Sequence, residues 1–417
     1  MFDSFLKHRW LIVLSAIAAS IVLGCGMVYA LIVLRPDIGA QGADSLRQVV
    51  GQQAVAQLET TVYDAQDTLY QWLAQLGLKR AESPWVVAQV PMVAAAATAT
   101  AEPLPMATTT TRPAPTSTSQ PKATATATVT PSPTWQPNPI LPFTTMAGEG
   151  QWQPYLQDGS GRTIAFRAFA APDAQRPYVM VGIVAFDLRA TQLHFVLGSE
   201  EPKSSVAVER TGRIPTADEH AGKLLTVFNG GFKADHGQYG AMVNNVIVLP
   251  PRRGHMTVAI AADGTVRMGA WGVDDITSPS TTAWRQNGPA IIQRGQINPL
   301  TEEMTAANWG ANIDGSVAVW RSALAQSQDG RVLYYAAGDS LIVATLARAL
   351  LAASAYQAMQ LDINNYWVYF GAVKWDGARL NSEPLFDKMK NHDTRRYLNG
   401  YSRDFFYVTA REPLALP

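Results

Sequence analysis

Three patterns of hydrophobic and polar positions follow one another along the chain. Residues 10–34 carry no formal charge and are predominantly apolar. Between residues 44 and 78 apolar side chains recur every three or four positions, and beyond residue 148 they form short runs separated by turn residues. These patterns predict a membrane-spanning helix, then an amphipathic helix, then a domain built from short strands.

The first pattern is long enough to cross a bilayer, because a helix needs only about 20 apolar residues to span the hydrocarbon core. Lys7 and Arg9 precede the run, and the two charges that follow it cancel. Positive charge stays on the cytoplasmic side of a membrane helix. We therefore expect residues 1–9 in the cytoplasm, residues 10–34 as an uncleaved signal-anchor in contact with lipid, and the rest outside the cytoplasm.

Two alternatives to a retained helix remain open. Val22-Leu23-Gly24-Cys25 resembles a lipobox, in which Cys25 would be acylated, and Val28-Tyr29-Ala30 resembles a cleavage site for signal peptidase. Both require the apolar segment to end near the cut, since the apolar core of a signal peptide has about 7–15 residues. Here the segment continues to Leu34, which favours the uncleaved helix.

The second pattern has the spacing of a coiled-coil seam. Its apolar positions are Val55, Leu58, Val62, Ala65, Leu69, Trp72 and Leu76. Such a series predicts either a weak dimer through residues 55–76 or a juxtamembrane helix that packs on its own chain or on lipid.

A segment rich in Ala, Thr and Pro, residues 83–147, separates this helix from the strands. Few large apolar side chains and many prolines leave too little surface to bury against the entropy of ordering. We expect an extended linker, and about 60 residues of such a chain can span well over about 100 Å. Residues 148–417 then form the globular domain.

Composition restricts the class of protein further. The chain has 33 basic and 33 acidic residues, which argues against a nucleic-acid partner, because such proteins carry a basic surplus. Its single cysteine is Cys25, so the exported domain has no disulfide, which favours a bacterial source. The six histidines show no metal-ligand spacing, and no nucleotide- or cofactor-binding motif occurs; we expect no cofactor.

The globular part reads as an α+β domain of mostly antiparallel strands with a few helices. Residues 178–186 and 192–197 predict a hairpin joined by a turn at 187–191, and residues 256–261 and 266–268 predict a second one around Ala262-Asp263-Gly264. A helix is expected from Leu341 to Tyr356, with Asp339 and Ser340 capping its first amide groups. The remaining predicted strands are residues 224–228, 246–249, 290–293, 317–321, 332–336, 359–363, 367–370 and 405–408.

Several short motifs follow one another in a defined order. They are a strand followed by Asn-Gly-Gly-Phe in Val227–Phe232, a Gly-Pro-hydrophobic element in Asn287–Ile292, an Arg-Ser-x-hydrophobic segment in Trp320–Leu324, Asp-Gly-x-hydrophobic in Asp329–Val332, the helix from Leu341, and Leu-Asp in Gln360–Asp362. In this order the motifs resemble the phosphodiester glycosidase family, whose animal member removes N-acetylglucosamine from a mannose phosphodiester. The resemblance covers about residues 224–370. Where the family has Asp-Gly-Gly-Gly-Ser, this chain has Asp362-Ile363-Asn364-Asn365-Tyr366.

This resemblance implies a site for a sugar-1-phosphodiester. Such a substrate requires a cation for its phosphate, polar groups for its hydroxyls, and a carboxylate for the chemistry at C1. Asp362 and Arg321 are the catalytic candidates, Arg321 because a guanidinium binds two phosphate oxygens in a planar fork. The candidates for substrate binding are Asn229, Gly230, Gly231, Phe232, Lys233, His236, Ser322 and Trp367.

Each candidate also has a structural interpretation. Arg321 can form a salt bridge at a strand end, Asp362 can cap a turn, and Trp367 can belong to the core. The functional hypothesis is therefore an anchored extracytoplasmic hydrolase acting on a carbohydrate or sugar-phosphate polymer of the cell envelope. The alternatives are a catalytically inactive glycan-binding module with the same fold and a structural spacer.

Overall fold

The computed structural model describes residues 42, 45–47, 49–85, 135–220, 222–302, 309, 317–391 and 393–411. Among these residues no helix combines the length and the apolar character needed to cross a bilayer. The predicted membrane segment 10–34, with Cys25, lies outside the described residues, as does most of the predicted linker.

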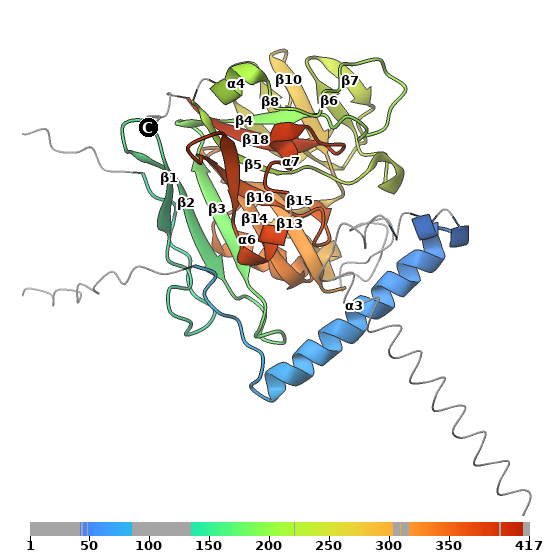
Figure 1. Ribbon diagram of the computed structural model, residues 1–417, viewed down its shortest axis with the longest axis vertical. Coiled ribbons are helices and arrows are strands. Elements are labelled where there is room, and N and C mark those ends of the chain that lie inside the picture. Colours follow the sequence, from blue (N-terminus) through green and yellow to red (C-terminus); the bar gives the residue numbers. More distant parts are fainter. Residues whose placement is uncertain are drawn as a thin grey trace, which may run out of the picture.

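Three sheets form the globular domain, and every strand pair among the described residues is antiparallel (Figure 1). Sheet A has the order β1 (Gln153–Gln157), β2 (Thr163–Ala170), β3 (Val181–Asp187), β14 (Val332–Leu341), β13 (Val319–Gln326), β15 (Gln357–Ile363), β11 (Ala290–Gln293) and β12 (Gln296–Ile297). Sheet B has the order β17 (Leu380–Pro384), β16 (Phe370–Trp375), β5 (Leu224–Asn229), β18 (Phe405–Ala410) and β4 (Thr191–Val196). Sheet C has the order β7 (Val246–Leu249), β6 (Ala241–Val243), β10 (Thr281–Gln286), β8 (Met256–Ala261) and β9 (Val266–Ala270).

The helices are few and mostly short. α6 (Val343–Ala352) covers one face of sheet A, where its Leu346 and Leu350 pack against Ala323 and Ala336. The opposite face of sheet A meets sheets B and C across the main core, which contains Phe186, Tyr335, Phe228, Phe370 and Val258. The other short elements are α4 (Thr216–His220), α7 (Arg396–Asn399) and the 3₁₀ turns η1 (Ala234–His236), η2 (Pro299–Glu302) and η3 (Asp387–Asn391).

The predicted class, mostly antiparallel strands with a few helices, is confirmed for this domain. The hairpin of β8 and β9 is confirmed as well. The predicted hairpin of β3 and β4 is wrong, because β3 pairs with β2 and β14 in sheet A, whereas β4 pairs with β18 in sheet B. The chain changes sheets at this turn, so two adjacent apolar runs face the same core from two sides.

The predicted cap of the long helix is also wrong. Asp339 and Ser340 lie in β14, which extends to Leu341, and α6 begins only at Val343 after Ile342, which makes no side-chain cap. The carbonyl of Leu341 is instead bonded by the side chain of Arg321.

A separate helix, α3 (Gln52–Gln75), lies within the predicted amphipathic range 44–78 and packs against the globular domain (Figure 1). Its Asp67 is buried and accepts two hydrogen bonds from the Arg176 guanidinium, at 3.0 Å and 2.7 Å, and one from the Tyr178 hydroxyl. Tyr70 lies edge-on to Tyr178 with ring centroids 5.7 Å apart, and Ala74 packs on the same core.

The residues on both sides of the segment 86–134 are packed on the domain. Trp85, which follows α3, lies against the rings of Phe169 and Phe386. Trp135 lies edge-on to Phe166, with ring centroids 5.6 Å apart, and the nearby Ile140 is buried. Packing of the domain therefore begins before residue 148, and α3 is part of the packed body.

The docking of α3 is expected to depend on Asp67. Asp67→Ala leaves Arg176 without its bidentate partner, and hydrogen bonds to charged groups contribute about 1.5–3 kcal/mol. We expect the free energy of unfolding, measured in urea, to fall by an amount in this range. Amide hydrogen exchange should increase across residues 52–75. Asp64→Ala removes the same charge from an exposed position of the same helix and is the matched control. Equal exchange in the two variants would show that this ion pair does not hold the helix.

Candidate functional site

The predicted site residues come together where the three sheets meet. Asn229 ends β5 of sheet B, and its side-chain amide donates to the Ser322 hydroxyl of β13 in sheet A at 2.9 Å. That hydroxyl donates to the main-chain carbonyl of Asp362 at 2.8 Å. The side-chain oxygen of Asn229 accepts from the Tyr335 hydroxyl at 3.0 Å. Asn229 and Ser322 are buried, so these bonds fix the position of Asp362 relative to both sheets.

A register shift turns Asp362 towards sheet B. Three residues of β13, from Arg321 to Ala323, lie opposite four residues of β15, from Gln360 to Ile363. Such bulges re-aim side chains and occur next to active sites. In a regular strand Gln360 and Asp362 would share one face. Here the Gln360 side chain bonds Arg321, whereas Asp362 is paired with Arg403, which lies two residues before the start of β18.

Arg321 is fully buried among main-chain acceptors. Its guanidinium donates to the carbonyls of Leu341 and Val317, both at 2.8 Å, and to the Gln360 side chain at 2.9 Å. Its neighbour Ser322 points to the opposite face of β13, where it joins Asn229. The structure therefore brings Asn229, Ser322 and Asp362 together and directs the Arg321 side chain away from them.

The cation beside Asp362 is Arg403, which the sequence did not suggest. One of its terminal nitrogens contacts the Asp362 carboxylate and also donates to the carbonyl of Gly231 at 3.0 Å. Its guanidinium lies 4.4 Å from the centroid of the Trp367 ring. Its Nε is buried and has no hydrogen-bond partner among the described residues. Burial opposes the positive charge, but Asp362 and Asp404 outweigh this effect and raise the pKa of Arg403.

Burial raises the pKa of the Asp362 carboxyl from 3.8 to about 6. The charge of Arg403 and the N–H of Ile363, which donates to the carboxyl at 3.0 Å, act in the opposite direction, while Asp404 adds to the rise. A carboxyl with a pKa near 6 can hold or release a proton close to neutral pH, which general acid–base catalysis requires.

The Asn-Gly-Gly segment is held against a second, fully buried ion pair. Arg285 at the end of β10 donates to Asp404 at 2.9 Å, and both side chains are wholly inaccessible. The N–H of Gly230 donates to the Asp404 carbonyl and that of Gly231 to its carboxylate, at 3.1 Å and 3.2 Å. A Cβ on Gly230 would lie 2.4 Å from the Asp404 carboxylate, so only glycine fits there. Both amides are used within the protein.

Phe232, Lys233 and His236 continue this segment. Phe232 is buried beside Ile363, whereas Lys233 and His236 are partly exposed. The Lys233 ammonium lies 5.4 Å from the centroid of the half-buried Trp367 ring. Burial, together with the positive charges of Arg403 and Lys233, lowers the pKa of His236 to about 4. Lys233 and Arg403 therefore place two positive charges beside the Trp367 ring, next to the Asp362 carboxyl.

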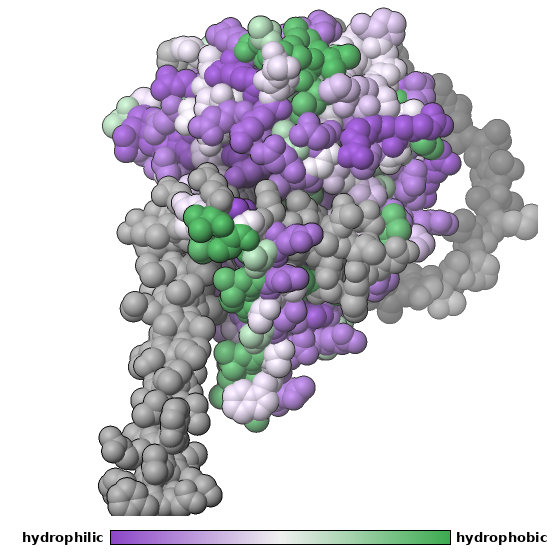
Figure 2. Space-filling view, turned by 90° about the vertical axis from the view of Figure 1, so that its right-hand side faces the viewer, coloured by the Kyte–Doolittle hydropathy of each residue, from purple (hydrophilic) through white to green (hydrophobic). Residues whose placement is uncertain are grey.

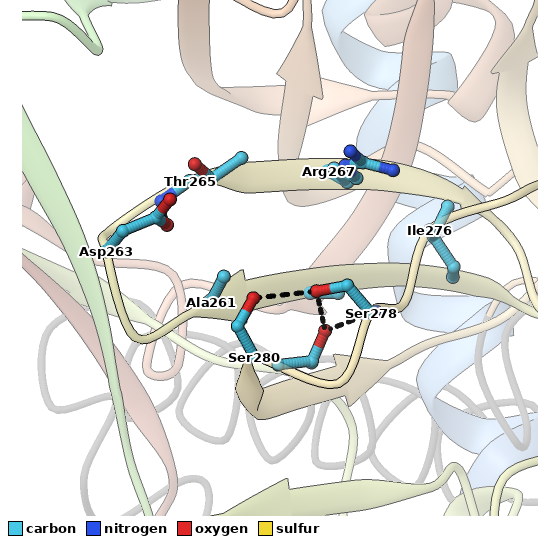
Figure 3. A pocket seen from close by; sticks show the side chains of 9 residues that line it. Ala261, Asp263, Thr265, Arg267, Ile276, Ser278 and Ser280 are labelled. Atoms are coloured by element: carbon cyan, nitrogen blue, oxygen red, sulfur yellow. Dashed lines mark hydrogen bonds between the residues drawn. The ribbon is translucent and has the colours of Figure 1, made fainter.

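A cavity of about 200 Å³ lies elsewhere, between β8, β9, β10 and the segment before β10 (Figure 3). None of the predicted site residues lines it. The hydroxyl of Ser278 bonds those of Ser280 and Thr281, and Arg267 lies 3.8 Å from Asp275. We assign no role to this cavity.

The raised pKa of Asp362 predicts a pH-dependent cost to folding. An aspartate with a pKa of about 6 in the folded state and 3.8 when unfolded stabilises the fold fully below about pH 4 and loses this contribution as the pH rises past 6. The free energy of unfolding is thereby lowered by about 3 kcal/mol. Asp362→Asn does not titrate, so we expect it to be more stable than the native chain at pH 7 and about equal at pH 4. Denaturant unfolding at both values measures this, and Asp275→Asn, at an exposed position, is the control.

Comparison with known proteins gives a family match over about a third of the chain. Residues 222–362 match the sequence profile of the NAGPA family, described as phosphodiester glycosidase. The chain contains a phosphodiester glycosidase-like domain. The family resemblance predicted from the motifs is thereby confirmed. The profile ends at Asp362, so Arg403 and Asp404 of this phosphodiester glycosidase-like domain lie beyond the matched residues.

Solved structures give more distant similarities. The catalytic domain of zebrafish N-acetylglucosamine-1-phosphodiester alpha-N-acetylglucosaminidase, auto-inhibited by its pro-peptide, aligns with a TM-score of 0.39 at 14% identity, over 63% of this chain and 88% of that one. A hypothetical protein from Synechocystis aligns with a TM-score of 0.33 at 11% identity, over 62% and 64%. A putative exported protein from Burkholderia pseudomallei aligns with a TM-score of 0.25 at 9% identity, over 60% and 75%. No curated protein gives a significant match.

Proposed function

We propose that this domain hydrolyses the bond between a sugar and a phosphate in a glycosidic phosphodiester of the cell envelope. The observation that carries the proposal is the pairing of Asp362, whose pKa burial raises to about 6, with Arg403 inside a phosphodiester glycosidase-like domain. A titrating carboxyl and a fixed guanidinium are the two groups that a sugar-1-phosphodiester requires.

The roles follow from the contacts. Arg403 and Lys233, which both lie by the Trp367 ring, would bind the phosphate. Asp362 would supply a proton to the leaving oxygen or accept one from the attacking water. Asp404 is a positioning residue, because its carboxylate is bonded to Arg285 and to the Gly231 amide. Arg321 would support the site by holding Gln360 and the ends of β13 and β14.

The test is release of free sugar from a synthetic sugar-1-phosphodiester by the purified full-length chain. Turnover that follows the concentration of the protein and that Asp362→Asn abolishes would support the proposal. No release from a panel of gluco-, galacto- and N-acetylglucosamine phosphodiesters would remove it.

A glycan-binding module without activity is the second candidate, and the loop after Asp362 favours it. Ile363, where the family has a glycine, is buried in a cluster with Phe232, Tyr239 and Val319. Its side chain fills space beside the catalytic candidate, and a glycine loop would leave that space to the ligand. This candidate predicts saturable binding of envelope glycan without release of sugar. Calorimetry with the full-length chain distinguishes the two.

We also propose that residues 10–34 anchor the chain in the cell membrane, with residues 1–9 in the cytoplasm and the domain outside. The uncharged length of this segment and the basic residues before it support the anchor. Protease added to intact cells should digest the domain, and alkaline carbonate should not extract the protein. A soluble form of lower mass would instead indicate cleavage, and labelling with a fatty acid that Cys25→Ser abolishes would indicate lipidation.

A further inference from the structure

The helix α3 has two apolar faces, and only one of them contacts the domain. The inner face carries Tyr63, Asp67, Tyr70 and Ala74, all of which meet the domain. The outer face carries the seam from Leu58 to Leu76, and its large side chains are exposed: Leu58 by 55%, Leu69 by 48%, Trp72 by 55% and Leu76 by 53%. Val55, the first apolar position of the predicted series, is buried and is not part of this exposed stripe. Figure 2 shows hydrophobic side chains along α3 on the surface of the molecule.

The two faces point in nearly opposite directions. At about 100° per residue, the positions of the inner face are centred roughly 150° around the helix from those of the outer seam. Contact with the domain therefore does not cover the seam from Leu58 to Leu76, and it does not prevent another helix from reaching it. Four large apolar side chains on one helix stripe of a water-exposed surface indicate an interaction site.

The spacing of the seam fits another helix of the same kind. From Leu58 to Leu76 the apolar positions alternate by four and three residues, which is the repeat of a coiled coil. The flanking positions that would face a partner are Thr61, Gln66, Thr68 and Gln75, all uncharged, and Glu59, whose carboxylate is bonded by Arg47 of the same chain at 2.8 Å. Two identical helices can therefore approach without repulsion between like charges.

The charge of the helix argues against a lipid surface as the occupant. α3 has three acidic residues, Glu59, Asp64 and Asp67, and no lysine or arginine. Helices that lie on membranes carry basic residues on their polar face, because the lipid headgroups are anionic. An acidic helix with an apolar stripe is suited to a protein partner instead.

We propose that two copies of this chain pair through the outer seam of α3, with each helix still docked on its own domain. The pairing stacks Leu58, Ala65 and Leu69 of one helix against the other as knobs into holes. The exposed seam from Leu58 to Leu76 spans fewer than three heptads, so the coiled coil is short and the dimer dissociates at low protein concentration. The two candidate sites are then carried on one particle, each on its own domain.

The test is sedimentation equilibrium of the full-length chain in a density-matched nonionic detergent, from micromolar to submillimolar concentration. We expect a monomer–dimer equilibrium. Leu69→Glu places a charge in the seam of both copies and should weaken the dimer on the order of 100-fold. Gln57→Glu adds the same charge to α3 outside the seam and is the matched control. Both positions are exposed, so both variants should melt at the temperature of the native chain.

Three outcomes would overturn the proposal. A monomer at every concentration would show that the seam is covered by another part of the chain, by lipid or by a different protein. A dimer that Leu69→Glu leaves intact would use another surface. Equal weakening by Leu69→Glu and Gln57→Glu would reflect the added charge and not the seam. Enzymatic turnover does not enter the measurement, so the result is independent of the proposed function.

Discussion

Asp362→Asn is expected to lower the release of sugar from a sugar-1-phosphodiester by about 100- to 10,000-fold, the range that a general acid or base contributes. Asparagine keeps the shape of the side chain but neither donates an acidic proton nor accepts one. The same variant should be more stable than the native chain at pH 7, because it removes the cost of ionising a buried carboxyl. Loss of activity together with a gain in stability separates a chemical role from a folding defect.

The pH profile gives an independent check on this residue. Burial sets the pKa of Asp362 to about 6, so kcat/KM should change slope near pH 6. Arg403→Gln removes the charge that opposes this rise, and the change of slope should move to higher pH. Arg403→Gln should also raise KM, since the variant loses a cation at the phosphate site.

The matched control for activity is Asp235→Asn, an exposed aspartate of η1 close to Lys233 in sequence. Activity should remain near that of the native chain. If Asp362→Asn retained native turnover while Asp235→Asn did not, the assignment of the catalytic carboxyl would be wrong. A native rate in both variants would place the chemistry elsewhere in the domain.

Arg285→Met is expected to destabilise the fold by about 3–5 kcal/mol, the cost of leaving one charge of a buried pair without its partner. Arg285 and Asp404 are wholly inaccessible and 2.9 Å apart. Arg285 also donates to the carbonyls of Phe232, Tyr239 and Gln286, so its loss leaves several buried acceptors unsatisfied. Urea unfolding at pH 7 measures the change.

Arg267→Met provides the comparison, because Arg267 and Asp275 form an exposed pair at 3.8 Å. Exposed pairs contribute less than about 1 kcal/mol, so this variant should unfold close to the native midpoint. Similar small shifts in both variants would mean that Arg285 is not essential to the fold. If Arg285→Met does not accumulate in soluble form, Arg285→Lys, which keeps the charge and loses the planar fork, gives the graded measurement.

Local patterns in the sequence predicted those parts of the fold that depend on local physics. The β8–β9 hairpin was predictable because Ala262-Asp263-Gly264 provides both a turn and a positive φ at Gly264. The separation of β3 from β4 was not, since it depends on pairing with strands more than 100 residues away. Asp339 and Ser340 look like a helix cap in sequence, yet β14 continues through them because it pairs with β13 as far as Leu341.

The site was predictable to a similar extent. Asn229 is the last residue of one apolar strand and Asp362 the last but one of another, and the ends of these strands converge here. The side to which each residue points was not predictable, because the bulge between Gln360 and Ile363 has no local signal. Arg403 follows no motif and reaches Asp362 only because β18 pairs with β5. Its position two residues before an apolar strand is the one clue that the sequence contains.

The packing of Trp85 and Trp135 on the same body changes what the segment between them can do. Because Trp85 and Trp135 both pack on the domain, these contacts set the distance between α3 and the sheets, and the number of residues between the two tryptophans does not. Any spacing from a membrane is then set by the residues that precede α3. A single proteolytic cut within 86–134 would also leave α3 in place as a noncovalent fragment, held by Asp67, Tyr70 and Ala74. A cut in this segment would therefore convert the contact of α3 with the domain from an intramolecular contact into one that dilution can dissociate.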